Sequence, residues 1–189
     1  MSDLPNSVPR FRGEVSVGDV LVTREGPRVV SWAIRLGARL MGLPALVNHV
    51  IIVHHRDPVT GHWVGIEGRP SGTGWTDVTA RLAGPLTNAN TLQPKTEDQR
   101  YLIATAAESL INTTYDWTAI AEAARWALHI RLQAAAEWPE DAVPGAVVCS
   151  SFADWAYERV GLGNPGGTAL TRFTVPGHWD RFMIEGKWT

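Results

Sequence analysis

A disulfide within this chain is excluded, because its 189 residues contain only one cysteine. The apolar runs are interrupted by Arg, Gly or Pro before a membrane-spanning length, so we expect no transmembrane helix. The opening MSDLPNSVPRFRG lacks the basic and apolar regions of a signal peptide. A formal net charge of −2 offers no broad basic field for a nucleic acid. We expect a protein that is cytoplasmic as synthesised, with delivery by a phage particle or a secretion machine as an alternative.

The residues that are present describe an ordinary globular chain. Hydrophobic residues make up 44% and charged residues 19%, which argues against disorder. The length suits one domain, which we place at 15–189 behind an N-terminal arm at 1–14. An Ala-rich stretch at about 118–138 is expected to be a helical insertion in that domain.

Hydrophobic periodicity predicts a mixture of helices and strands. Strands are expected at 15–23, 46–55 and 62–68, and the stretch 69–95 is expected to be mainly loop with a short strand at 75–78. Helices are expected at 27–42, from a capping box at Thr96 and Gln99, and from Cys149 to a stop at Gly161. This pattern predicts an α+β fold.

Cys149 follows the apolar run Ala146-Val147-Val148 and begins a predicted helix. Unpaired N–H groups and the positive end of the helix dipole favour a thiolate at such a position. The same N–H groups could stabilise an oxyanion during acyl transfer. A lone cysteine is equally often a small buried hydrophobic residue, so both interpretations stay open at this point.

His49 begins a predicted strand, and Glu67 lies on the strand that should pair with it. If the hairpin closes so that His55 pairs with Gly61, His49 lies directly opposite Glu67. The carboxylate could then orient the imidazole, as the third member of a catalytic triad does. A slip of one residue in register would place Glu67 on the other face.

A zinc site is the main alternative for this hairpin, which also contains His54, His55 and His62. Zinc needs three or four converging ligands, and neighbouring strand residues such as His54 and His55 should point to opposite faces. The sequence contains neither a CxxC nor an HExxH pattern. We therefore predict no metal and no cofactor.

The order of several short motifs resembles that of the circularly permuted NlpC/papain-like superfamily, which includes YiiX-like hydrolases and lecithin retinol acyltransferase-like enzymes. In that superfamily the strand with the histidine precedes the helix with the cysteine. The resemblance covers about 15–180 and rests on Gly18-Asp19-Val20-Leu21, Asn48-His49-Val50, Ile66-Glu67, Tyr115-Asp116, Val148-Cys149-Ser150-Ser151 and Thr174-Val175-Pro176.

The resemblance implies a permuted papain-like fold, with a small antiparallel sheet or half-barrel packed against helices. It implies that Cys149 is the nucleophile, His49 the base and Glu67 the third member. Tyr115 and Ser150 are expected near the substrate or the oxyanion. The implied function is cysteine-dependent hydrolysis of a peptide-like amide, ahead of an acyl-lipid ester. A non-catalytic binding or structural module that keeps the fold is the alternative, and a metal-dependent hydrolase is a further one.

Overall fold

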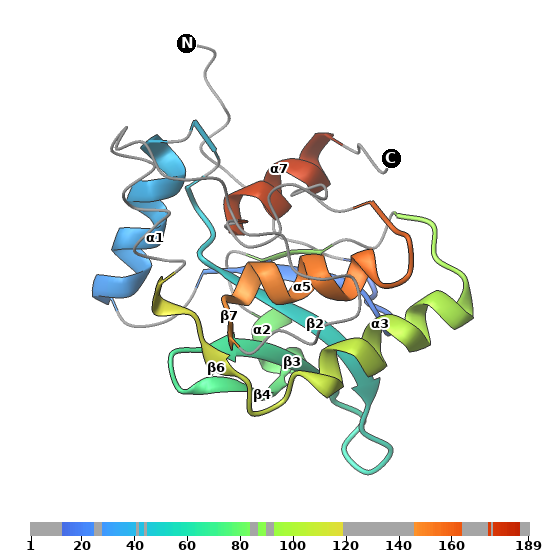
Figure 1. The fold of residues 1–189 in the computed structure, drawn as a ribbon. Coiled ribbons are helices and arrows are strands. Elements are labelled where there is room, and N and C mark those ends of the chain that lie inside the picture. Colours follow the sequence, from blue (N-terminus) through green and yellow to red (C-terminus); the bar gives the residue numbers. More distant parts are fainter. Residues whose placement is uncertain are drawn as a thin grey trace.

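The chain has an α+β fold in which a small antiparallel sheet packs against helices (Figure 1). The computed structural model describes residues 13–24, 28–40, 42–43, 45–83, 87–89, 93–118, 146–163, 174 and 176–185. The expected N-terminal arm and the expected helical insertion fall almost entirely outside these residues. Among the helices in these ranges, none combines the length and apolar character needed to cross a membrane.

Five strands form the main sheet in the order β4-β3-β2-β1-β5, and every neighbouring pair is antiparallel. Their bounds are β1 Val20–Thr23, β2 His49–Arg56, β3 Trp63–Arg69, β4 Gly72–Asp77 and β5 Thr87–Ala89. The longest strand, β2, lies at the centre, which explains the nearly continuous β-branched run at its start.

Both faces of the central part of β2 are buried. On one face, Val50 and Ile52 of β2 pack in a core with residues of α3 (Glu97–Ser109) and α5 (Cys149–Glu158). On the other face, Ile51 and Val53 pack with Val78, the first residue of α2 (Val78–Leu82). Figure 1 shows α3 and α5 across the same face of the sheet. Alternate residues of β2 therefore belong to different cores.

The described residues contain two further helices. Helix α1 (Arg28–Leu40) lies between β1 and β2 in the chain, and α7 (Pro176–Glu185) packs against α1, α5 and β1. The predicted capping box at the start of α3 is confirmed, because Thr96 and Gln99 exchange side-chain and backbone hydrogen bonds. The predicted stop after α5 is also confirmed, since Gly161 has a φ of 67°.

Two sequence-based predictions of secondary structure are wrong. The first strand begins at Val20 rather than at residue 15, because Gly18 adopts a φ of 78° in a turn. The stretch 69–95 is not mainly loop, because it contains all of β4, α2 and β5. Gly72 and Gly74 in β4 weakened the strand pattern, and pairing with β3 along the whole of β4 outweighs that weak local preference.

A second, two-stranded sheet brings two distant segments together. Strand β6 (Thr114–Tyr115) pairs in parallel with β7 (Ala146–Val147), so that Tyr115 lies beside Val147. Backbone hydrogen bonds from Thr73 to Thr113 and from Asn112 to Thr73, each 2.9 Å long, attach this segment to β4. The short sheet therefore places Tyr115 next to the start of α5.

Candidate active site

Cys149 is the first residue of α5 and lies directly over β3. Val148 before it is extended, with φ −95° and ψ 162°, and its N–H donates to the Ser151 hydroxyl at 3.1 Å. The backbone of Cys149 approaches β3 so closely that a Cβ on Gly68 would lie 3.2 Å from the Cys149 Cα. The residue is 3% exposed. The start of the helix is thus fixed against the sheet by backbone packing.

The His49 imidazole lies between the thiol of Cys149 and the carboxylate of Glu67. Its Nε2 is 2.5 Å from Glu67 Oε2, and the ring also hydrogen-bonds the Cys149 side chain. Glu67 is buried, whereas the His49 side chain is 13% exposed. Since Glu67 occupies Nε2, Nδ1 is the ring nitrogen left for the thiol. The structure therefore brings the three residues expected from the sequence into one hydrogen-bonded chain.

The predicted pairing of His49 with Glu67 is wrong by two positions, because Glu67 pairs with Ile51. The connection between the strands is longer than expected, and a β-bulge at His54 shifts the register between Val53 and His55. Without this bulge the pairing at the hairpin end, His55 with Val64, would continue and would place Glu67 opposite Ile52, on the other face. The bulge therefore returns Glu67 to the face that carries His49.

The electrostatics of the pair favour its charged form. Burial alone would lower the pKa of His49, but the hydrogen bonds and charges of Cys149 and Glu67 outweigh it and raise that pKa to about 10. Burial alone would raise the pKa of Glu67, but His49, Arg69 and Thr76 lower it to about 2. At neutral pH the site therefore contains an imidazolium that is hydrogen-bonded to an ionised carboxylate.

Tyr115 and Ser150 both lie next to Cys149 but differ in what their hydroxyls contact. The Tyr115 side chain hydrogen-bonds Cys149, and burial together with the charge of Cys149 raises the pKa of its phenol. The ring of Trp117, which is 48% exposed, lies 5.0 Å from the Tyr115 ring. The Ser150 hydroxyl instead donates to the carbonyl of Thr174. For an oxyanion, Ser150 therefore offers its backbone N–H rather than its hydroxyl.

Two arginines at this site were missed by the sequence analysis. Arg69 and Arg81 both contact Oε1 of Glu67, the oxygen that His49 does not use, and the Arg81 Nη2 lies 3.5 Å away. Arg69 was within reach of sequence reasoning, since it lies two residues after Glu67 on one strand and so shares its face. Arg81 lies on α2, within a stretch that was expected to be loop.

The histidines that suggested zinc form pairs rather than a cluster. The bulge brings His54 and His55 together, with their Nδ1 atoms 2.9 Å apart, so the expectation that they point to opposite faces is wrong. His54 also lies 3.3 Å from Glu108, and His62 lies 3.3 Å from Asp77. Across the described residues, no group of three or more His, Cys, Asp or Glu side chains could hold a metal ion.

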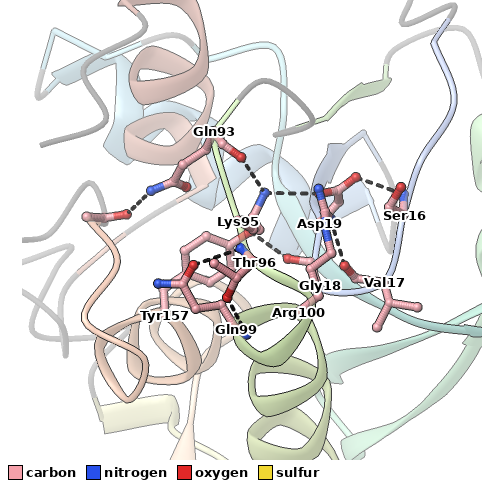
Figure 2. Close-up of polar contacts among 11 residues, drawn as sticks. Ser16, Val17, Gly18, Asp19, Gln93, Lys95, Thr96, Gln99, Arg100 and Tyr157 are labelled. Atoms are coloured by element: carbon pink, nitrogen blue, oxygen red, sulfur yellow. Dashed lines mark hydrogen bonds and ion pairs between the residues drawn. The ribbon is translucent and has the colours of Figure 1, made fainter.

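Figure 2 shows a buried ionic network around Asp19. The network lies at the opposite ends of β1 and α5 from the candidate site. Lys95, whose side chain is fully buried, lies 3.0 Å from Asp19, and Arg100 reaches the same carboxylate oxygen at 2.9 Å. The Tyr157 hydroxyl on α5 donates to the carbonyl of Gly18 at 2.6 Å. This network joins the start of β1 to α3 and α5, and it thereby holds the helix of Cys149 against the sheet.

No protein-family model matches the chain, and no curated protein matches it.

Proposed function

We propose that this chain is a cysteine-dependent hydrolase of permuted papain-like type, with Cys149 as nucleophile, His49 as base and Glu67 as the residue that orients the imidazole. The observation that carries the proposal is the position of His49 between the thiol and a buried, ionised carboxylate. A carboxylate on one ring nitrogen holds the other nitrogen toward the nucleophile and stabilises the imidazolium.

The chemical steps follow from this arrangement. In the resting pair His49 already holds the proton of the Cys149 thiol, and the thiolate attacks the carbonyl carbon of an amide or ester. The resulting oxyanion accepts hydrogen bonds from the N–H groups at the start of α5. His49 then returns the proton to the leaving amine or alcohol, which leaves a thioester on Cys149. Water, deprotonated by His49, hydrolyses that thioester and restores the free thiol.

The surroundings of the thiol support an apolar group next to the scissile bond. Tyr115 contacts Cys149, and the exposed Trp117 ring continues the aromatic surface away from it. Such a surface suits an apolar side chain of a peptide or the start of an acyl chain. We rank a peptide-like amide ahead of an acyl ester, and a matched pair of peptide anilide and acyl ester substrates tests that ranking.

The decisive variant is His49→Gln rather than Cys149→Ala. Because Cys149 is the sole cysteine, its replacement removes labelling by any thiol reagent, catalytic or not. We expect His49→Gln to lower the rate of Cys149 alkylation by iodoacetamide at pH 6, where an unpaired thiol is almost fully protonated. His62→Gln is the matched control, since the His62 side chain is half-exposed near the turn of the same hairpin and lies 3.3 Å from the exposed Asp77. Equal rates in the two variants would refute the proposal.

One observation favours the non-catalytic binding module instead. Cys149 is only 3% exposed and belongs to the main hydrophobic core. A thiol that serves only to fill that core would react slowly with iodoacetamide at every pH, and replacing His49 would leave that slow rate unchanged. The pH profile of alkylation in the wild-type chain therefore separates the two functions.

A further inference from the structure

The two oxygens of the buried Glu67 carboxylate have different partners. Oε2 hydrogen-bonds His49, whereas Oε1 receives both Nε and Nη2 of Arg69. Arg81 adds a more distant contact to Oε1 at 3.5 Å. The Thr76 side chain also hydrogen-bonds this carboxylate. One oxygen therefore serves the imidazole while the other is held from the opposite side.

Arg69 is itself fixed in place. It is the last residue of β3, two positions after Glu67, and its Nη2 donates at 2.8 Å to the carbonyl of Trp75 on the neighbouring strand. A planar guanidinium that binds a carboxylate through two nitrogens and a carbonyl through one of them cannot turn without breaking several hydrogen bonds. The geometry of the Glu67 carboxylate is thus tied to the backbone of β4.

Holding Glu67 in this way has a direct consequence for His49. An ionised carboxylate can only accept hydrogen bonds, so its imidazole partner must carry a proton on Nε2. If the carboxylate rotated or took up a proton, the imidazole could turn or change tautomer and lose its alignment with Cys149. Arg69 opposes both events, because it binds Oε1 directly and its charge favours the ionised form.

We propose that Arg69 is a positioning residue of the active site, which acts through Glu67 to keep the His49 imidazole aligned with Cys149. This inference rests on the proposed function for its role in catalysis, but its structural content can be measured without any turnover.

The sign of one measurement separates positioning from a simple charge effect. Arg69 and the His49 imidazolium carry charges of the same sign, so removing Arg69 as a charge alone would raise the pH at which His49 titrates. Removing it as a support for Glu67 weakens the hydrogen bond that favours the imidazolium, and so lowers that pH. Among the described residues, the charged or titratable groups that face the His49–Glu67 pair are Cys149, Arg69 and Arg81.

The experiment titrates His49 by nitrogen-15 NMR in the full-length chain with Arg69→Met, Arg69→Lys and the control Arg56→Met. Arg56 ends the neighbouring strand, and its side chain donates to the carbonyl of Gly61 at the far end of the hairpin from Glu67. We expect Arg69→Met to reduce the proton affinity of His49 about tenfold, one pKa unit. Arg69→Lys should restore part of that affinity, and Arg56→Met should leave it unchanged.

A double-mutant cycle completes the test. If Arg69 acts through Glu67, then Arg69→Met should no longer lower the pH at which His49 titrates once Glu67→Gln has been made. A raised or unchanged titration point in folded Arg69→Met, or an equal effect in the Glu67→Gln background, would overturn the inference. Failure of the proposed function would instead be seen in the alkylation experiment, as a rate of iodoacetamide alkylation that is the same in wild type and His49→Gln.

Discussion

Replacing Gly68 by alanine would push directly on the candidate nucleophile. Gly68 lies on β3 beneath the first residue of α5, and an added Cβ would lie 3.2 Å from the Cα and 3.3 Å from the N of Cys149. Both are backbone atoms, so a side-chain rotation cannot relieve the contact, and the start of α5 must move by a few tenths of an ångström. Gly74 on the next strand is the matched control, because a Cβ there meets nothing within 4 Å.

The magnitude follows from two opposing contributions. An alanine in a strand interior is about 0.5–1 kcal/mol more favourable than glycine, and neither glycine has the positive φ that would cancel this gain. Overpacking of a core costs about 1–3 kcal/mol. Gly68→Ala should therefore be less stable than Gly74→Ala by about 1–3 kcal/mol, which at this chain length lowers Tm by about 2–4 °C for each kcal/mol.

The effect on reactivity should exceed what the loss of stability explains. A 1 Å misplacement of a reacting group costs about a hundredfold, so a shift of a few tenths should slow the chemistry about 4- to 10-fold. The assay is the rate of iodoacetamide alkylation of Cys149 at pH 6 and at a temperature where both variants are folded, with Tm measured by circular dichroism. Equal rates and equal Tm in Gly68→Ala and Gly74→Ala would refute the argued packing of α5 on β3.

The buried ionic network and the candidate site each carry a further prediction. Asp19→Asn leaves the buried ammonium of Lys95 without its carboxylate and should lower the free energy of unfolding by about 3–5 kcal/mol in urea. Glu108→Gln removes the exposed carboxylate that contacts His54, and it should lower the free energy of unfolding by less than about 1 kcal/mol. A similar loss of stability in Asp19→Asn and Glu108→Gln would contradict this account. The stability that the His49 and Glu67 charges contribute should be largest between pH 4.5 and 6.5. Because the folded pKa of His49 is raised, its share is complete below 6.5 and is lost as pH rises toward about 10. Because the folded pKa of Glu67 is lowered, its share is complete above 4.5 and is lost as pH falls toward about 2. Urea unfolding of wild type and Glu67→Gln across this range measures the difference, and a flat difference from pH 5 to 9 would rule out the raised value.

Local signals in the sequence located much of the described fold. The helix that begins after Thr96 was predictable because its capping box involves residues only three positions apart. The apolar run that begins at Val50 was predictable as a strand because β-branched residues favour a buried sheet. Strand β4 was missed because its glycines carry little local preference, and only pairing with β3 gives it order.

The candidate site was also predictable from the sequence only in part. The sequence by itself identified Cys149 at a helix start and His49 and Glu67 on neighbouring strands, since those positions follow from local periodicity and motif order. Only the tertiary structure decided which face Glu67 occupies, because a one-residue bulge at His54 reverses that face and leaves no local signature. It also decided that Arg81 would reach Glu67 and that Gly68 would lie under Cys149, since both contacts join segments that are distant in the chain.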